Sequence, residues 1–394
     1  MAAPEQCGAV APSCASAVFT QLFNATHPMT KQEVAAAVGV SLPTVYQAFN
    51  ALDDRGLLAP GEERGSTGGR RAATFRIPHD GTGAIGISVT GSEMRAVVCN
   101  LYGERYTGLV IDTELAASSS AAALNTALRK LVDELFAKAE RRGIEIVGTG
   151  IGLPSAIEPA TGRLINTKVL RLTDSTVLAR DITAGIPGAV GVFNDADCGA
   201  FAQFCPAGGE GYHADGCGFV GSARTMAYLS LERGVGGSIL INGTPLHGVR
   251  NLSGEFGHIC VETGGRACTC GQHGCLEAYC STAALAEEQG CTLEDFFNRA
   301  AERDRRALEA LDSYLGHLAR GIHAIRMVLD CPVVIGGITS YYLQPYIGRL
   351  DALVRDLDPF ASAGQQPVMT SLHPFHGVAF GAALQMVERF IATL

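Results

Sequence analysis

The sequence lacks a hydrophobic run of about 20 residues, which is the length that a membrane-spanning helix needs. It also lacks a basic leader before its first apolar stretch, so the N-terminus does not resemble a secretory signal peptide. Positive charge is scarce: 30 basic against 39 acidic residues leave a net charge of -9, which opposes the field that a general nucleic-acid coating protein needs. We therefore expect a cytoplasmic protein with no membrane partner.

Charged residues are few, 18% of the chain, beside 47% hydrophobic residues, and this balance excludes a disordered protein. A length of 394 residues predicts two or three domains. Cysteine is abundant instead of scarce, and its number, 13, is odd. In a chain without an export signal we expect reduced thiols rather than a disulfide framework.

The first 80 residues are nearly neutral, with six basic and seven acidic side chains, and they predict a helix-turn-helix. Thr30 and Glu33 form a capping-box pattern at the start of one short helix, which we expect to end at Gly39. Ser41 is placed to cap a second helix, which tolerates Pro43 in its first turn.

Two strand-like segments, at 57–59 and 74–77, flank a tip and add a wing to this pattern. We therefore expect a winged helix-turn-helix DNA-binding domain over residues 1–79. The alternative is a small helical bundle with no DNA partner. The arginine-rich segment that ends this region favours DNA binding.

The remainder of the chain repeats one order of elements, which is three strands, a helix and a strand. The first set is predicted at 85–89, 95–99, 106–111, 124–135 and 144–151. The second set is predicted at 219–220, 227–231, 238–241, 308–325 and 333–335. The segment 234–237 is expected to form a turn within the second set. This repetition predicts an α/β protein with two related lobes.

A short glycine-rich segment brings together one imidazole and three thiols, those of His258, Cys268, Cys270 and Cys275. Such a Cys3His set is a closed tetrahedral site for structural zinc, because it leaves no position for a catalytic water. The alternative is four ordinary side chains in a cysteine-rich protein. If one ligand is wrong, Cys280 and His273 are the nearest substitutes.

Polar side chains near this segment are candidates for ligand binding. Glu255 and Glu277 can accept hydrogen bonds from ligand hydroxyls, although a solvated loop charge is the alternative for each. Asn194 and Asp195 follow the apolar stretch 189–192. Asp195 is thus a candidate general base, whereas an Asn-Asp pair after a strand is often only a turn.

Longer motifs connect these residues. The most specific are GEFGH at 254–258 and CTCGQHGCLE at 268–277, and supporting motifs lie at 66–71, 150–154, 194–196 and 333–337. Together they resemble the ROK family of repressors, open reading frames and kinases, and in particular its sugar-responsive regulators with a winged helix-turn-helix. The resemblance covers the chain from about Thr20 to its end.

The resemblance implies an actin-like, hexokinase-like domain over residues 80–394. Its smaller lobe would span about 80–192 with a C-terminal helix at about 377–394, and its larger, zinc-containing lobe would span about 193–376. The zinc would be held by the Cys3His residues named above. The resemblance further implies a sugar site lined by Asn194, Asp195, Glu255, His258 and Glu277. In kinases of the family, the residue at Asp195 is the base that takes the proton of the sugar hydroxyl.

Two phosphate-binding loops of those kinases are altered in this chain. Where the kinases have Asp-x-Gly-Gly-Thr, residues 88–92 read SVTGS, and where they have Gly-Thr-Gly-x-Gly-Gly-Gly, residues 232–238 read ERGVGGS. Phosphate binding needs closely approaching backbone amides, and the Glu232 carboxylate adds repulsion. We therefore expect no ATP and no catalytic residue, with Asp195 as the base if the chain is a kinase.

The expected recognition helix carries few cations. Its candidate DNA-binding residues, together with two arginines of the wing, are Thr44, Tyr46, Gln47, Asn50, Arg70 and Arg71. A solvated helix face is the alternative. Because each protomer offers so little positive charge, we expect two heads of a homodimer or tetramer to meet one pseudo-palindromic operator.

The leading hypothesis is thus a sugar-sensing transcription regulator of the repressor kind, which binds operator DNA and a monosaccharide or sugar-derivative effector. One alternative is an ATP-dependent ROK sugar kinase that retains a DNA-binding head. Another is a regulator that is titrated by a protein partner.

Overall fold

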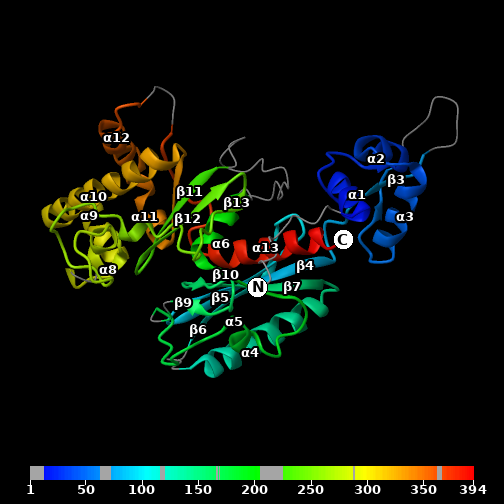
Figure 1. Ribbon diagram of the computed structural model, residues 1–394, viewed down its shortest axis with the longest axis horizontal. Coiled ribbons are helices and arrows are strands. Elements are labelled where there is room, and N and C mark those ends of the chain that lie inside the picture. Colours follow the sequence, from blue (N-terminus) through cyan, green and yellow to red (C-terminus); the bar gives the residue numbers. More distant parts are fainter. Residues whose placement is uncertain are drawn as a thin grey trace, which may run out of the picture.

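The computed structural model describes residues 13–62, 72–115, 120–165, 167, 169–204, 225–286, 289–361 and 366–394. Three bodies follow one another along the longest axis (Figure 1). We call them the N-terminal unit (13–77), the central lobe (82–194 with 377–392) and the distal lobe (195–370). Each of the two lobes contains a five-stranded sheet in its described part.

The N-terminal unit packs helices on a three-stranded sheet with the order β1-β3-β2. Its elements are α1 (Cys14–Phe23), β1 (Met29–Thr30), α2 (Lys31–Val38), α3 (Leu42–Asp53), β2 (Ala59–Pro60) and β3 (Thr74–Arg76). The capping box is confirmed: the Glu33 amide donates to the Thr30 hydroxyl at 3.2 Å, and the Thr30 amide donates to the Glu33 carboxylate at 2.7 Å. Gly39 ends α2 in the left-handed conformation, as expected. Sequence reasoning missed β1, because two residues show no periodicity.

The sheet of the central lobe has the strand order β10-β7-β4-β5-β6. Antiparallel pairing joins β4, β5 and β6, whereas β7 and β10 run parallel to β4. Helix α4 covers one face with the leucine stripe that the sequence predicted. The elements are β4 (Thr82–Val89), β5 (Glu93–Asn100), β6 (Arg105–Glu114), α4 (Ala121–Glu140), β7 (Glu145–Leu153), β8 (Ala156–Ile157), β9 (Leu164–Ile165), α5 (Ala179–Thr183) and β10 (Val190–Asn194).

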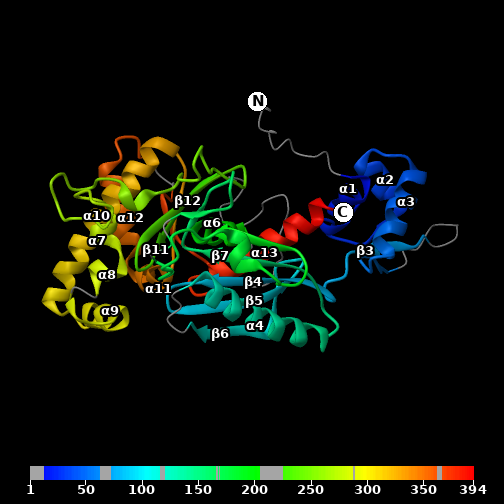
Figure 2. The same cartoon turned by 60° about the horizontal axis from the view of Figure 1, so that its bottom comes forward.

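The other face of this sheet is covered by the C-terminal helix α13 (Gly377–Ala392), which Figures 1 and 2 show lying along the strands. Glycines allow this close approach. A Cβ atom at Gly86 would collide with the Ala379 carbonyl, and one at Gly150 would collide with the Ala382 carbonyl. The chain thus returns from the distal lobe to complete the central one.

The sheet of the distal lobe has the order β13-β12-β11-β14-β15. Its strands are β11 (Met226–Leu231), β12 (Val235–Ile241), β13 (Thr244–Pro245), β14 (Val333–Gly336) and β15 (Val368–Thr370). Its helical elements are α6 (Asp195–Phe201), η1 (Ala202–Phe204), η2 (Phe256–His258), α7 (Glu277–Cys280), α8 (Thr282–Leu285), α9 (Leu293–Ala301), α10 (Arg305–Leu329), α11 (Ile338–Leu343), η4 (Gln344–Tyr346) and α12 (Ile347–Leu357).

The turn predicted at 234–237 is wrong in part, because β12 already begins at Val235 and Gly237 lies opposite Leu229 in the ladder. Gly237 is required by packing, since a Cβ there would collide with Phe256. The strand expected at 219–220 lies outside the described residues.

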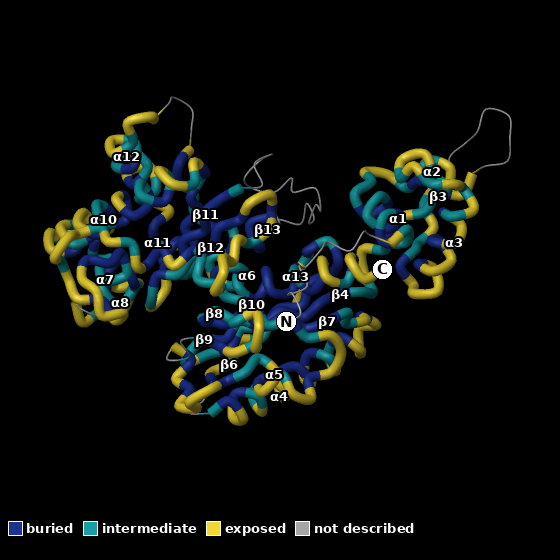
Figure 3. The backbone as a smooth tube through the Cα atoms, viewed as in Figure 1, coloured by how far each residue is buried: buried dark blue, intermediate teal, exposed yellow. Residues whose placement is uncertain are grey.

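A single hydrophobic cluster crosses from the N-terminal unit into the lobes. It contains Phe19 of α1, Phe49 of α3, Phe201 of α6 and Phe380 of α13. Figure 3 shows buried segments inside each of the three bodies. At the junction, the buried Ser16 hydroxyl donates to the Ile391 carbonyl at 2.9 Å. No helix in the described part of the chain is long and apolar enough to span a membrane.

Candidate metal centre and sugar site

Four potential metal ligands converge in the loop that follows η2. One donor atom from each of His258, Cys268, Cys270 and Cys275 lies within 4.8 Å of the other three. The Cys268 sulfur is 3.7 Å from His258 Nδ1, and the Cys270 and Cys275 sulfurs are 3.8 Å apart. Cys268 and Cys275 are buried, whereas His258 and Cys270 are exposed. The cluster can hold a metal ion, with two ligands facing the protein and two facing solvent.

Backbone turns bring these ligands together. Gly271 and Gly274 adopt φ angles of 89° and 80°, which side chains other than glycine rarely tolerate. A Cβ atom at Gly274 would also collide with the Glu262 carbonyl. An isolated β-bridge pairs Ala267 with His273 across the loop. The backbone of His273 thus helps to form the loop, and its side chain is not one of the four potential metal ligands.

The two glutamates lie next to this cluster. Glu277 Oε1 accepts a hydrogen bond from the Thr269 hydroxyl at 3.0 Å, and its Oε2 accepts one from the Val235 amide at 3.1 Å. Glu255 Oε2 lies 3.9 Å from Nε2 of His258. The imidazole thus presents Nδ1 to the sulfurs and Nε2 to a carboxylate, so one ring can face a metal and a ligand hydroxyl at once.

Asn194 and Asp195 lie where β10 ends and α6 begins. The Asn194 side-chain oxygen caps the helix by accepting from the Ala196 and Asp197 amides at 2.9 and 3.2 Å. Asp195 is half-buried, and its Oδ1 accepts from the Ala196 amide at 2.8 Å. Desolvation is the main cause that raises the pKa of Asp195 to about 7, and the negative charges of Glu232 and Asp197 add to it. A carboxyl group with this pKa exchanges protons near neutral pH.

Sequence reasoning missed a neighbouring group around Asp197. Its carboxylate accepts from the Ser238 hydroxyl at 2.6 Å and lies 3.5 Å from Nδ1 of His247. Burial raises the pKa of Asp197, and the hydrogen bond from Ser238 acts in the opposite direction. The only sequence signal was its position two residues after Asp195.

Strand β12 connects the two groups of candidate residues. Its first residue, Val235, donates to Glu277 beside the metal cluster, and Ser238 donates to Asp197 beside Asp195. The candidate sugar-binding residues therefore belong to two clusters with one strand between them.

The altered second phosphate loop, residues 232–238, includes the start of this strand. The Glu232 carboxylate accepts a hydrogen bond from the Ile338 amide at 2.8 Å, at the start of α11. Gly337 lies beside it with a φ angle of 76°, where a Cβ atom would be 2.9 Å from the carboxylate. A protein carboxylate thus accepts a backbone amide hydrogen at this turn.

The candidate DNA-binding side chains of α3 are accessible in part. Tyr46, Gln47 and Asn50 are exposed, and the Thr44 hydroxyl is 2.7 Å from the Ser41 hydroxyl. Lys31, which sequence reasoning did not single out, places its ammonium 4.1 Å from the centre of the Tyr46 ring. Arg70 and Arg71 lie outside the described residues.

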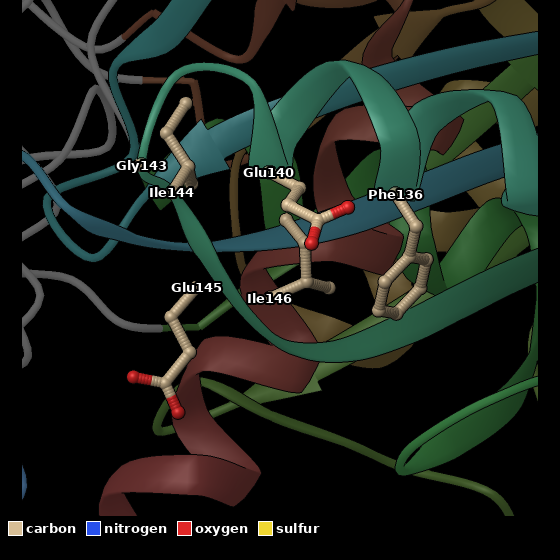
Figure 4. A pocket seen from close by; sticks show the side chains of 6 residues that line it. All are labelled: Phe136, Glu140, Gly143, Ile144, Glu145 and Ile146. Atoms are coloured by element: carbon tan, nitrogen blue, oxygen red, sulfur yellow. The ribbon is translucent and has the colours of Figure 1, made fainter.

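A hollow of about 500 Å³ lies where the end of α4 meets the start of β7. Figure 4 shows the side chains around it. It is lined by Phe136, Glu140, Gly143, Ile144, Glu145 and Ile146. None of the candidate site residues lines it, so it is separate from the metal cluster and from Asp195.

Comparisons with known proteins agree with this architecture. The model of the ROK family matches residues 84–357. An N-acetylmannosamine kinase of Salmonella typhi is 28% identical over 287 residues, which are 68% of this chain and 91% of that protein. An N-acetylmannosamine kinase of Salmonella agona (strain SL483) is 30% identical over 280 residues, which are 66% of this chain and 88% of that protein.

Solved structures show the same fold. A ROK family transcriptional regulator, a homolog of the E. coli MLC protein, has a TM-score of 0.76 at 18% identity and covers 96% of each chain. A ROK family glucokinase from Streptomyces griseus, in complex with glucose and AMPPNP, has a TM-score of 0.59 at 19% identity and covers 76% of this chain and 98% of its own. The predicted fold class, an N-terminal winged helix-turn-helix followed by a two-lobed α/β domain, is confirmed. The chain belongs to the ROK family.

Proposed function

We propose that this protein is a sugar-sensing transcription regulator that binds operator DNA through its N-terminal unit. The observation that carries the proposal is the extent of the structural match. The regulator structure covers 96% of this chain, whereas the glucokinase structure covers 76%. The N-terminal unit, whose described residues form three helices and a three-stranded sheet, is thus the feature that favours a regulator over a kinase.

The sugar site would combine Asn194, Asp195, Glu255, His258 and Glu277. Carboxylate and amide groups suit a sugar because they accept and donate paired hydrogen bonds to neighbouring hydroxyls. Amino sugars are the first ligands to test, because curated relatives are named N-acetylmannosamine kinases. A bound sugar would change DNA affinity only if it binds two conformations of the protein with different affinity.

The Cys3His cluster would hold a structural zinc ion. The donor set fits, because three thiolates and one imidazole within 4.8 Å complete a four-coordinate site. When bound, the ion would hold the His258 ring and the loop that carries Glu277 in fixed positions. No step of a reaction is assigned to it.

A specific observation at Glu232 supports the absence of ATP turnover. Its carboxylate accepts the Ile338 amide hydrogen, so a negative charge already lies at the turn that contains Gly337. A nucleotide phosphate near this turn would meet electrostatic repulsion. Phosphoryl transfer depends on charge neutralisation and positioning, which this arrangement opposes.

The alternative function is an ATP-dependent sugar kinase, and two observations favour it. The curated relatives are kinases, and Asp195, with a pKa raised to about 7, could accept a hydroxyl proton. Release of ADP, measured with a panel of hexoses and amino sugars, decides between the two. Sugar-dependent turnover that is lost in Asp195→Asn would establish the kinase and overturn the regulator as the sole function.

The regulator proposal is tested by fluorescence anisotropy on the DNA upstream of the gene that encodes the protein, with and without each sugar. We expect one sugar to change the DNA affinity at least about fivefold, which corresponds to a coupling free energy of about 1 kcal/mol. Glu255→Gln is expected to weaken the sugar effect while DNA binding without sugar stays unchanged. If the protein binds DNA but no sugar alters the affinity, effector sensing is wrong and a protein partner becomes the better candidate.

A further inference from the structure

Cys260 and Cys275 lie opposite each other in an isolated antiparallel β-bridge at the metal centre. Two backbone hydrogen bonds of 2.8 Å flank the bridge, Val261 N to Gly274 O and Leu276 N to Ile259 O. This pattern defines a non-hydrogen-bonded pair, in which the two Cα atoms are about 4.5 Å apart and the side chains leave the same face. A disulfide bond spans Cα separations in this range.

Cys260 stands outside the group of four potential ligands. Its side chain is exposed, and its sulfur lies 3.9 Å from the His273 carbonyl oxygen. Cys275 is only 2% exposed, and its sulfur is directed to Cys270. The glycine at 274 leaves space beside the Cys260 sulfur, because a Cβ atom there would be 3.2 Å from it. An accessible thiol is thus in register with a buried thiol of the metal cluster.

We propose that Cys260 is an oxidation site for hydroperoxides and forms a disulfide with Cys275, which removes one ligand from the metal cluster. The proposal rests on the Cys3His cluster as a zinc site. It concerns a residue that the sugar and DNA sites do not use. It also accounts for a fourth cysteine at this place, which an ion with one histidine and three cysteine ligands does not need.

The chemistry needs only a hydroperoxide as oxidant. The Cys260 thiolate attacks one peroxide oxygen, the O–O bond breaks, and a sulfenic acid forms while the other oxygen leaves as an alcohol or water. The Cys275 thiolate then attacks the sulfenic sulfur, the S–S bond forms, and hydroxide leaves and is protonated to water. The two sulfurs together lose two electrons, which the peroxide gains. The ion then keeps three protein ligands, which hold zinc more weakly than four.

The test treats the full-length, zinc-loaded protein with hydrogen peroxide under conditions where it stays folded. Zinc release is followed with a metallochromic indicator, and disulfides are mapped by mass spectrometry of peptides. We expect a peptide pair joined through Cys260 and Cys275. Cys260→Ser should hold one zinc ion per chain and release it about tenfold more slowly, because the accessible thiolate is absent. Cys291→Ser, a partly buried cysteine outside the bridge, is the matched control and should behave like the unaltered protein.

Several results would overturn the proposal. One is zinc release from Cys260→Ser at the rate of the unaltered protein. Another is a disulfide that joins Cys275 to Cys268 or Cys270 instead of Cys260. A Cys260→Ser protein that lacks zinc before oxidation would make Cys260 a metal ligand. If the unaltered protein contains no zinc, the metal assignment fails by itself, and peptide mapping still decides whether the Cys260–Cys275 pair oxidises.

Discussion

At the scale of single residues, the raised pKa of Asp195 couples folding to pH. The pKa of its carboxyl group rises from an ordinary value near 4 to about 7 on folding, mainly because burial disfavours the charged form. The folded protein therefore holds a proton that the unfolded chain has lost between about pH 4 and pH 7. Stability contributed by this group is present at low pH and is lost as the pH rises through 7.

Asp195→Asn should remove this loss. We expect the variant to be more stable than the unaltered protein by roughly 2 to 4 kcal/mol at pH 8, and by no more than about 1 kcal/mol at pH 4.5. Urea unfolding at both pH values measures the difference. A difference that is the same at both pH values would show that the charge of Asp195 does not carry the effect.

Cys275 offers a second prediction at this scale. It is almost fully buried and lies in the proposed metal cluster, so Cys275→Ala should weaken zinc binding strongly and lower the free energy of unfolding by about 3 kcal/mol or more. Metal analysis and denaturant unfolding check both parts. Cys14→Ser in the N-terminal unit serves as the control and should keep its metal. If Cys275→Ala lacks metal but is as stable as the unaltered protein, the ion has no structural role.

At the scale of elements, the contact of α13 with the central sheet depends on small residues. Glycine at 86 and 150 has no alternative, because any Cβ would enter the backbone of α13. The sequence showed a high glycine content but did not show which glycines face a helix, since that depends on a segment more than 200 residues away.

Gly150→Ala is therefore expected to destabilise the protein by about 2 to 3 kcal/mol through overpacking. Gly316→Ala is the matched control, because Gly316 lies within α10 and a Cβ there meets nothing within 4 Å. The free energy of unfolding of the control variant should rise by up to about 1 kcal/mol, because alanine lowers the backbone entropy of the unfolded chain. Thermal unfolding of both variants gives the comparison, and equal effects would refute the close packing of α13.

At the scale of the whole molecule, the N-terminal unit is not an appendage on a flexible tether. Phe23 of α1 stacks on Tyr102 of the central lobe at 4.5 Å, and Arg55 lies over the Phe390 ring of α13 at 5.0 Å. Helix α13 also contacts α6, which begins at Asp195. One packed path thus joins the proposed sugar site to the proposed DNA-binding unit.

We predict that the N-terminal unit and the central lobe unfold together. Phe23→Ala should lower the midpoint temperature of that common transition and reduce the free energy of unfolding by about 3 to 5 kcal/mol, because a buried aromatic side chain is removed. Differential scanning calorimetry and hydrogen exchange of α1 and α13 amides give the measurement. If Phe23→Ala speeds hydrogen exchange of the α1 amides but leaves exchange of the α13 amides unchanged, the two parts unfold independently and the prediction is wrong.

The sequence by itself determined the local and chemical features. Cap residues such as Thr30 and Gly39 act within a few residues, and the four metal-cluster residues lie within one short segment, so neighbours in sequence sufficed to predict them. The repeated strand and helix order likewise predicted two α/β lobes, because hydrophobic periodicity is local.

Only the tertiary structure decided which distant segments meet. It placed α13 on the central sheet, Asp197 against Ser238 and His247, the Glu232 carboxylate on the Ile338 amide, and Cys260 opposite Cys275. These contacts come from packing and strand register, which depend on the fold of the whole chain, and a pattern along the sequence carries no direct record of them.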